Sequence, residues 1–483
     1  MQGRIKYNVM TPEELELMKN RLEDLLSIRG IEVDHAELVA ELAAKGAEVN
    51  GHNVKFSKDL IKKALSTIPA EFTLASPSGE FDLKFPHPTG DFYVRTNTGA
   101  MNYLDINNDS HYITLDEVAE WTQLINVMEN VNYCTLPSTS GEEVPVEAID
   151  VSTLAQVLKH SKKHIWIQPY ETENVQHLIN IAAAAAGGLE NLQKRPIVSF
   201  IACGVPVLTF KNMDAEVIYR CAKAGLPIQP CSLPTGGANT PVTAQGTALV
   251  ACAEVMAMII MAQLIGPGTP VIATTLLFSM DMMTTYTLQS NTEITMGRLI
   301  CMQLFEQGYN IRAHSYGTGT DSLVIDEQNM IERTSLIHMM AMSDASVLGG
   351  AGQLETAKTI SPLQLIIDNE IFGIARRLRR GLEVSDETLG YNEIMNGDDK
   401  AGFILSEHTM RHFTEPHRPL MFNRDGMAKW EQSGKKTLLD QALDRYRELV
   451  AKPVKIDLPE DKIKAIDQAL AEAHKALIKG GQQ

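Results

Sequence analysis

Aromatic, basic and polar side chains recur where short apolar segments of this sequence end. Tyr93, Phe278 and Tyr316 are three such aromatic residues, and Arg95 lies two positions after the first of them. An aromatic face attracts a quaternary ammonium ion through the ring quadrupole, at about 0.5–2 kcal/mol per contact. We therefore expect these rings to form an ammonium cage and Arg95 to bind a carboxylate through its planar fork. Packing of the rings and a structural ion pair of Arg95 are the alternatives.

Further side chains near the ends of these segments could contact the same small molecule. His314 lies within the segment NIRAHSYG, and we assign it as the candidate catalytic residue, beside the group that is transferred. A hydrogen-bonded structural histidine is the alternative for that position. The additional substrate-binding candidates are Asn97, Tyr103, Gln168, Tyr170, Asp321 and Glu355.

The sequence gives no strong sign of a metal or phosphate site. Cys203 and Cys231 end neighbouring apolar segments, so a zinc site with His314 is conceivable. Their contexts lack ligand spacing, however, and buried cysteine commonly packs as a small hydrophobic residue. We predict no intrinsic metal. The glycines of YGTGTD and GGAGQLE are interpreted as relieving backbone crowding, because neither segment has the form of a phosphate-binding loop.

Eight short apolar segments alternate with eight longer segments of helical period. Such alternation predicts parallel strands with right-handed crossovers, and eight units close a (β/α)₈ barrel. An open doubly wound sheet is the alternative, but no GxGxxG follows a predicted strand. The predicted strands are Asp91–Gly99, Val131–Ser138, His164–Tyr170, Pro196–Gly204, Pro227–Pro234, Pro270–Phe278, Asn310–Gly317 and Asp344–Gly350. The predicted helices are Leu115–Met128, Val146–His160, Glu173–Ala186, Met213–Ala224, Thr243–Ile265, Asn291–Gln307, Glu327–Met342 and Leu363–Arg380.

The barrel fixes where the candidate residues should meet, and two extensions flank it. Barrel enzymes keep their chemistry in loops at the carboxyl ends of the strands, where we expect the residues above. We divide the chain into a small α+β extension at 1–85, the barrel at 86–381 and a helical extension at 382–483. The first extension has three predicted helices and an Asn50-Gly51 hairpin turn; the last has helices at Lys435–Ala451 and Glu460–Ile478.

Composition excludes several classes of function. A formal charge of −17 disfavours nucleic acid and anionic membranes as partners, since both require a basic surface. Six scattered cysteines, with no CxxC pair, fit a reducing compartment. The first 20 residues contain no apolar run of a secretion signal, and Cys252, Glu254 and Gln263 interrupt the most apolar stretch, which we interpret as a buried helix. We expect a cytoplasmic protein.

Beyond these features, the sequence resembles the trimethylamine methyltransferase superfamily of corrinoid-dependent enzymes over nearly its whole length. The similarity includes LLSIRGIEVDHAELVAELAAKGAEVNGHNVKFSKDLIKKALSTIPAEFTLAS. It is most specific in TGGANTPVTAQGTALVACAEVMAMIIMAQLIGPGTPV. It continues through GTGTDSLVIDEQ and FILSEHTMRHF.

The resemblance implies a (β/α)₈ barrel that meets a separate corrinoid protein, whose cobalamin accepts a methyl group from a small amine. The founding enzyme carries pyrrolysine, which is absent here, and members without it are similar to enzymes that demethylate quaternary amines. Glycine betaine is the first expected substrate, with proline betaine and carnitine-type compounds next. We also expect a homo-oligomer. A zinc-dependent corrinoid methyltransferase acting on another donor, and a non-catalytic protein that binds betaine or the corrinoid protein, remain as alternatives.

Overall fold

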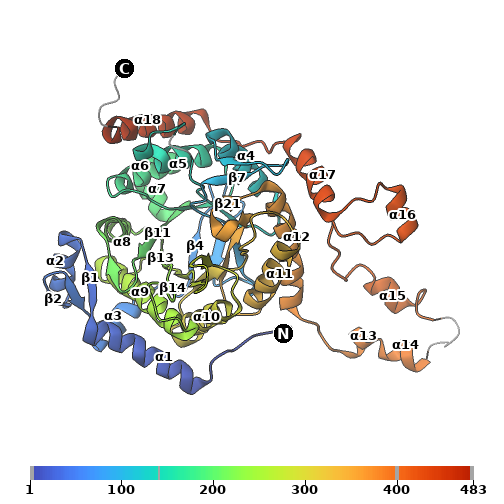
Figure 1. The fold of residues 1–483 in the computed structure, drawn as a ribbon, viewed down its shortest axis with the longest axis horizontal. Coiled ribbons are helices and arrows are strands. Elements are labelled where there is room, and N and C mark those ends of the chain that lie inside the picture. The colour runs from blue at the N-terminus through green and yellow to red at the C-terminus, as the bar shows by residue number, and fades with distance from the viewer. Residues whose placement is uncertain (1–4, 140–141, 397–401, 479–483) are drawn as a thin grey trace.

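The computed structural model describes residues 5–139, 142–396 and 402–478. Eight parallel strands close a barrel in the order β10-β11-β13-β15-β18-β19-β6-β9, and helices surround it (Figure 1). Each of the eight predicted strands coincides with one of them, so the predicted barrel is confirmed. The strands are β6 (Tyr93–Thr96), β9 (Tyr133–Thr135), β10 (His164–Ile167), β11 (Val198–Gly204), β13 (Ile228–Ser232), β15 (Ala273–Thr275), β18 (Ala313–Tyr316) and β19 (Val347–Ala351).

Eight helices follow the barrel strands at the predicted places. Local signals explain their starts: Thr114 caps α4 in a capping box with Glu117, and Thr243 and Asn291 cap α9 and α10. The helices are α4 (Leu115–Val127), α5 (Ile149–His160), α6 (Asn174–Ala186), α8 (Asn212–Ala224), α9 (Ala244–Ile265), α10 (Thr292–Gln303), α11 (Glu327–Ala341) and α12 (Pro362–Arg380). A short α7 (Leu189–Lys194) follows α6.

Helix α9 has apolar side chains on all its faces. It is the one helix among the described residues that is long and apolar enough to cross a membrane. Of its 18-residue apolar window 89% is buried inside the protein, and the helix packs between the barrel and the N-terminal extension. A helix buried on all its faces belongs to the core of the protein, as the sequence predicted.

A hairpin closes the amino-terminal end of the barrel. It consists of β4 (Phe72–Leu74) and β5 (Leu83–Phe85). The Phe85 ring lies 5.1 Å from that of Tyr93, the first residue of β6. His164, the first residue of β10, makes a hydrogen bond of 2.8 Å to the carbonyl of Ala75. Substrate access is therefore left to the opposite, carboxyl end.

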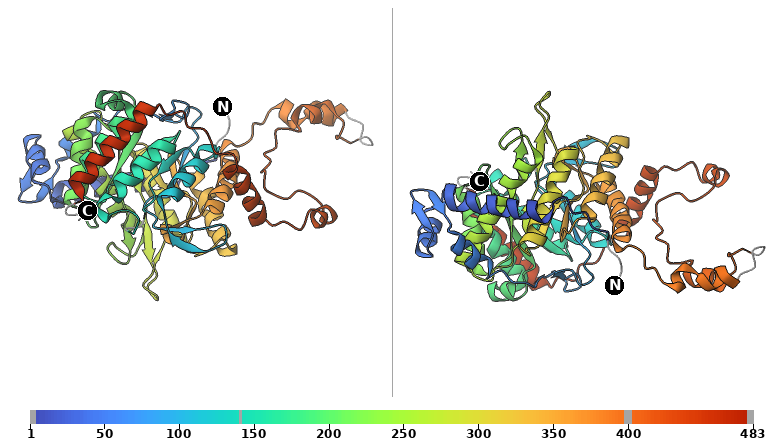
Figure 2. Two further views of the ribbon diagram at one scale, coloured as in Figure 1. Left: turned by 90° about the horizontal axis from the view of Figure 1, so that it is seen from above. Right: turned by 90° about the horizontal axis from the view of Figure 1, so that it is seen from below.

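Two small sheets lie at the carboxyl ends of the barrel strands. One has the order β14-β16-β17, and its hairpin projects from that end of the barrel as the yellow-green loop of Figure 2. The other has the order β20-β21-β7-β8. Their strands are β14 (Thr235–Gly236), β16 (Phe278–Met280), β17 (Thr287–Leu288), β20 (Gln353–Leu354), β21 (Thr359–Ile360), β7 (Asn102–Leu104) and β8 (Ser110–Tyr112).

The N-terminal residues pack on the outside of the barrel. A long helix, α1 (Pro12–Asp24), runs along α9, and a barrel loop contributes β12 (Thr209–Phe210) to the extension's sheet, in the order β12-β1-β3-β2. The expected Asn50-Gly51 turn joins β2 and β3. The other elements are β1 (Ile31–Val33), α2 (Ala36–Ala44), β2 (Glu48–Asn50), β3 (Asn53–Lys55) and α3 (Lys58–Leu65).

The chain after α12 leaves the body and then returns to it. The returning helices are α17 (Leu438–Val450), which packs on α12, and α18 (Glu460–Leu477), which packs on α5 and α6. Both match predicted helices. Between α12 and α17 the chain projects sideways from the barrel with four short helices (Figures 1 and 2). They are α13 (Asp386–Leu389), α14 (Tyr391–Asn396), α15 (Glu407–His412) and α16 (Met427–Gln432).

Candidate active site

A buried arginine, histidine and tryptophan share the interior of the barrel. Arg95 lies on β6, His314 on β18 and Trp166 on β10, and all three are fully buried. The Nε of Arg95 donates to Nε2 of His314 over 2.9 Å. The guanidinium carbon of Arg95 lies 3.9 Å from the centre of the Trp166 ring, in cation–π geometry. These contacts fix the position of the arginine.

The hydrogen bonds also determine the protonation of His314. Because Nε2 accepts from Arg95, its proton resides on Nδ1, which lies 3.1 Å from the hydroxyl of Thr274. Burial, together with the nearby charge of Arg95, holds the pKa of His314 well below its ordinary value. His314 is therefore neutral at pH 7, and both of its ring nitrogens are engaged.

Arg95 is a buried cation whose ion-pair partner is absent from the described residues. Its Nη1 donates to the carbonyl of Thr96 over 2.7 Å, whereas its buried Nη2 finds no hydrogen-bond partner among them. Burial lowers the pKa of Arg95 to about 10, so the guanidinium is still charged at pH 7. An unpaired buried charge is costly by several kcal/mol. The geometry is that of a site prepared for an anion.

Two of the predicted cage rings meet above this cluster. Phe278, the first residue of β16, and Tyr316, the last of β18, lie edge to face with ring centres 5.8 Å apart. Both are buried and belong to the same cluster of barrel side chains as Trp166. Burial raises the pKa of Tyr316 to about 12, and the positive charge of Arg95 opposes that rise. The aromatic pair and the guanidinium thus share one small region.

A second buried arginine, Arg298 of α10, was not among the predicted residues. Its Nη2 donates to the carbonyls of Leu277 and Gln289, at 2.6 and 2.7 Å. Its Nε and Nη1 are buried without a partner in the described part of the chain, and burial lowers its pKa to about 10. The guanidinium lies 5.7 Å from the centre of the Tyr316 ring. In the sequence, this buried arginine could have been found as the one charged residue in the otherwise apolar stretch GRLICM.

A strained loop lies at the mouth. Glu355, Thr356 and Ala357 are consecutive non-glycine residues in the left-handed region, with φ of 51°, 51° and 75°. Such backbone costs on the order of 1 kcal/mol per residue or more, and it persists where surrounding contacts impose it. Here Asn97 donates through Nδ2 to the carbonyl of Ala357 at 2.8 Å, and Asp321 accepts from the hydroxyl of Thr356 at 3.0 Å. Two predicted residues therefore hold this loop.

Asp321 connects three loops of the mouth. Besides Thr356, its carboxylate accepts the backbone N–H groups of Gln289 and Ser290, at 2.7 and 3.2 Å. Glu355 accepts from the hydroxyl of Thr359 at 2.7 Å. These two predicted residues are thus engaged in shaping the mouth.

Gln168 and Tyr170 follow β10. The amide oxygen of Gln168 accepts from the hydroxyl of Thr98 at 3.1 Å, so this side chain lies beside the loop after β6. The backbone N–H of Tyr170 donates to Asp150 at 2.9 Å, and its ring packs with the outer hydrophobic core. Gln168 therefore lies nearer than Tyr170 to the carboxyl end of β6.

Tyr93 and Tyr103 do not lie where the sequence suggested. Tyr93 is the first residue of β6, at the closed end of the barrel, where its hydroxyl donates to the carbonyl of Lys84 at 3.0 Å. Tyr103 lies on β7 and donates to Glu120 of α4 at 3.4 Å. Tyr93 therefore does not lie at the mouth. Tyr103 belongs to a sheet at that end of the barrel, but its hydroxyl faces α4 and its ring packs in the outer core.

Cys203 and Cys231 are paired residues of adjacent barrel strands. A hydrogen bond that the Cys203 thiol donates to Cys231, together with burial, raises the pKa of Cys203 well above its ordinary value. Across the described residues, no three His, Cys, Asp or Glu side chains are grouped as a metal site would require.

The fold and the site together define a class: a (β/α)₈ barrel closed at one end, with aromatic rings and two buried arginines near the other. The chain belongs to the trimethylamine methyltransferase (MTTB) family, whose sequence model matches residues 2–477. The resemblance deduced from the sequence is thereby confirmed. Members of this family are methyltransferases.

Relatives and solved structures agree with this assignment. Trimethylamine methyltransferase MttB1 of Methanosarcina acetivorans is 28% identical, over 96% of each chain. The glycine betaine methyltransferase of Desulfitobacterium hafniense is 24% identical, over 92% of this chain and 93% of its own. The crystal structure of the Methanosarcina barkeri monomethylamine methyltransferase covers 98% of this chain and 89% of its own, with a TM-score of 0.52 and 13% identity. The last similarity shows the shared fold.

Proposed function

We propose that this protein transfers a methyl group from a betaine, a quaternary amine that also carries a carboxylate, to the corrinoid of a partner protein. The observation that carries the proposal is the charged Nη2 of Arg95, buried without a partner among the described residues. A substrate carboxylate would supply the missing anion through a charge-assisted hydrogen bond. The Phe278–Tyr316 pair would then contact the ammonium group.

The charge balance favours a zwitterion over a simple cation. Arg95 of β6 and Arg298 of α10 place two buried positive charges near Tyr316, and the carboxylate of Asp321 opposes only that of Arg298. A ligand with only a positive charge would be repelled by both, and at low dielectric such repulsion is strong. A betaine carries its own carboxylate and is neutral overall. This argument excludes trimethylamine and tetramethylammonium as good substrates and includes glycine betaine, proline betaine and carnitine.

The residues of the site would act by positioning. His314 and Trp166 orient Arg95, Arg95 fixes the carboxylate, and the rings hold the ammonium with a methyl group toward the mouth. The corrinoid supplies the nucleophile, and the nitrogen keeps the electron pair of the broken C–N bond and leaves as a neutral tertiary amine. No proton has to be transferred. Correct placement of such reactants can contribute about 7–11 kcal/mol. His314, with both nitrogens engaged, is in this proposal a positioning residue.

The mouth also offers a surface for the corrinoid protein. The hairpin between β16 and β17 projects from this end of the barrel (Figure 2) and carries the exposed side chains of Met282, Met283 and Tyr286. Val242, near the same sheet, is also exposed. Exposed apolar groups of this kind are typical of a protein-binding surface. In this proposal the protein acts in the cytoplasm, where its partner is made.

A panel of methylated amines tests the proposal. The purified protein is mixed with each amine and with cob(I)alamin, free or on the cognate corrinoid protein, and loss of cob(I)alamin absorbance is followed. We expect transfer from one or more betaines, with equimolar demethylated amine, and little from trimethylamine or tetramethylammonium. Comparable turnover of trimethylamine would defeat the proposal. Stoichiometric zinc, with activity lost on chelation, would favour the zinc-dependent alternative. Betaine binding without methyl transfer would favour the non-catalytic alternative.

A further inference from the structure

Two residues at the base of the β16–β17 hairpin carry buried polar groups that the proposed transfer does not use. The side chain of Gln289 is fully buried, and neither its amide oxygen nor its amide nitrogen has a hydrogen-bond partner among the described residues. Its backbone carbonyl accepts from Nη2 of Arg298 at 2.7 Å. Nε and Nη1 of Arg298 are also buried and open in the described part of the chain. Folded proteins leave few such groups unsatisfied, so a ligand is expected here.

The open amide and guanidinium both lie close to the aromatic pair. The antiparallel register of β16 and β17, continued by one residue, places Gln289 opposite Phe278. Side chains opposite one another in such a pair lie on the same face. The Phe278 ring lies 5.8 Å from that of Tyr316, and the guanidinium of Arg298 lies 5.7 Å from the centre of the Tyr316 ring. The two groups therefore approach the proposed ammonium cage from the side of the hairpin.

Gly319 makes room for the amide of Gln289. A Cβ at this position would lie 2.8 Å from Oε1 and 2.9 Å from the amide carbon of Gln289. Contacts this short do not occur between real atoms, so any larger residue at position 319 would displace the amide. The loop after β18 thus leaves space for a side chain whose polar atoms have no partner within the described ranges.

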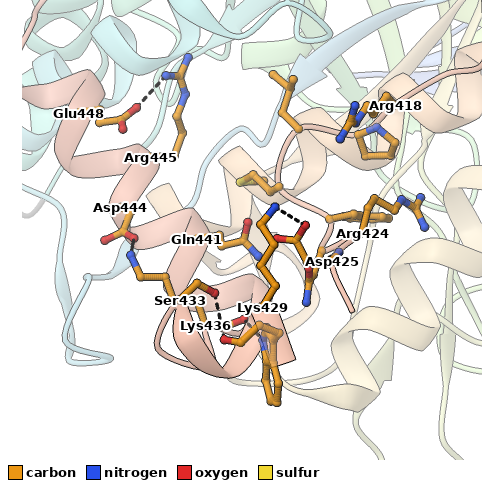
Figure 3. Close-up of a pocket in the computed structure, with 16 residues that line it drawn as sticks. Arg418, Arg424, Asp425, Lys429, Ser433, Lys436, Gln441, Asp444, Arg445 and Glu448 are labelled. Atoms are coloured by element: carbon orange, nitrogen blue, oxygen red, sulfur yellow. Dashed lines mark hydrogen bonds and ion pairs between the residues drawn. The ribbon is translucent and has the colours of Figure 1, made fainter. Parts of the chain in front are cut away.

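A polar recess on the surface has a different character. A cavity of about 650 Å³ lies between residues 418–425, α16 and α17 (Figure 3). Lys429 and Lys436 line it, and they pair with Asp425 and Asp444. Exposed pairs of this kind are stable in water without a ligand. The buried guanidinium and amide beside the cage have no such partners in the described structure, so they carry the stronger sign of a ligand.

A hydroxyl group is the chemistry that satisfies both residues at once. Arg298 can only donate, whereas the amide of Gln289 offers a donor and an acceptor. A hydroxyl oxygen accepts from Arg298 while its proton is donated to Oε1 of Gln289. A second carboxylate could only accept and would leave Oε1 unpaired. The negative charge of Asp321 also lies near Arg298, so a further anion is not required there.

We infer that Arg298 and Gln289 form a second subsite, which selects betaines with a hydroxyl on the carbon chain. The inference rests on the proposed function, in which Arg95 takes the carboxylate and the rings take the ammonium. One ligand can reach both subsites because both arginines lie near Tyr316. A betaine without a hydroxyl leaves the second subsite unpaired and is a slower substrate, because unsatisfied polar groups in a site oppose binding.

Two substrates that differ in one atom test the subsite: carnitine, and 4-trimethylammoniobutyrate, which lacks its hydroxyl. Wild type should have a kcat/KM about 10- to 100-fold higher for one enantiomer of carnitine than for the deoxy compound, as a hydrogen bond to a charged group predicts. The mirror-image carnitine should resemble the deoxy compound. Gln289→Leu removes the amide and keeps the backbone hydrogen bonds, and it should bring both ratios close to one. Arg298→Met should do the same.

A ratio of two substrates does not depend on the fraction of folded protein, so it separates selectivity from misfolding. Gln123→Leu on α4 is the matched control, because its buried amide oxygen also lacks a partner among the described residues but lies outside the barrel. It should leave both ratios unchanged. Equal values for carnitine and the deoxy compound in wild type, or ratios that survive in both site variants, would overturn the inference.

Calorimetry distinguishes a failure of this inference from a failure of the proposed function. Tighter binding of carnitine than of the deoxy compound, lost in Gln289→Leu, would support the subsite even if no methyl group were transferred, and the proposed function would then be wrong. Methyl transfer from betaines with no preference for the hydroxyl, in binding or in turnover, would refute the subsite and leave the proposed function standing.

Discussion

Replacing Arg95 tests whether its unpaired charge exists for the substrate. Arg95→Met keeps a side chain of similar length and removes the cation that lies 3.9 Å from Trp166. In the proposed complex, Nη2 has both protons available, since Nε and Nη1 already serve His314 and Thr96. One or two charge-assisted hydrogen bonds at about 1.5–3 kcal/mol each predict a loss of about 1.5–6 kcal/mol. That corresponds to a fall of roughly 10- to 20,000-fold in kcat/KM for glycine betaine.

The assay compares two substrates, so that damage to the site can be separated from loss of the contact. The kcat/KM values for glycine betaine and for tetramethylammonium, which lacks a carboxylate, are measured with cob(I)alamin in excess over the enzyme. Arg95→Met should lower the first strongly and leave the second unchanged or higher, since a repulsive charge has been removed. Arg95→Lys keeps a point charge without the planar fork. Its kcat/KM for glycine betaine should lie between the values of wild type and Arg95→Met.

Equal losses on the two substrates would refute the reasoning, because Arg95 would then act on the barrel structure alone. An unchanged value for every betaine would do so as well. Binding measured by calorimetry gives the same comparison without the corrinoid. A betaine whose affinity is insensitive to Arg95→Met must place its carboxylate elsewhere, and Arg298 is then the other buried cation to replace.

Three further outcomes are expected. Phe278→Leu and Tyr316→Leu keep apolar volume but delete most of the ring quadrupole, so each should lower kcat/KM for betaine by about 5- to 30-fold, or 1–2 kcal/mol, with an unchanged melting temperature. Gly349→Ala adds no polar or charged group, but it should reduce betaine turnover because the new methyl group would displace Arg95 and His314. Wild-type kinetics of this variant would contradict the prediction. Burial raises the pKa of Glu254 from 4.5 to about 7, so the folded protein binds this proton more tightly, and stability should fall as pH rises from about 5 to 8. Urea denaturation should show a smaller pH dependence for Glu254→Gln, and an identical one would remove Glu254 as a cause.

The barrel was predictable because its signal is repeated eight times. Each parallel strand is buried on both faces and reads as a short apolar run, and each helix has a longer period. Local caps such as Thr114 and Asn291 fixed the helix starts. The same logic applied to α9: interruption by Glu254 and Gln263 indicated a buried helix, and both side chains have hydrogen-bond partners inside the protein.

The positions of side chains along a strand were harder to predict. Tyr93, Arg95 and Asn97 alternate with outward residues and follow the barrel interior at successive depths, about 6–7 Å apart. The sequence shows their common direction but not where the hydrogen-bonded strand begins. Because β6 starts at Tyr93, that ring lies at the closed end, and the next two residues lie toward the mouth. The side chain of Tyr103 was misplaced for a different reason, since this residue belongs to a separate small sheet and its hydroxyl faces Glu120 of α4.

Contacts between distant segments could not be predicted at all. Arg298 lies on a helix outside the barrel. It belongs to the site only because its guanidinium lies 5.7 Å from the centre of the Tyr316 ring. The left-handed residues 355–357 are held by hydrogen bonds with Asn97, which donates, and Asp321, which accepts, and both residues lie far away in sequence. No local pattern records such pairings, because none of these residues has an intrinsic preference for its role.

Gly349 shows how a correct local interpretation can miss the function. The glycines of GGAGQLE were interpreted as relieving crowding, and a Cβ at Gly349 would indeed lie 2.6 Å from Nε2 of His314 and 2.8 Å from the guanidinium carbon of Arg95. The space is needed by two side chains rather than by the backbone, whose conformation at Gly349 is open to any residue. A small residue on β19 therefore allows an arginine on β6 to reach a histidine on β18. Without it, the buried cation could not be held in place, and a carboxylate would have no fixed partner.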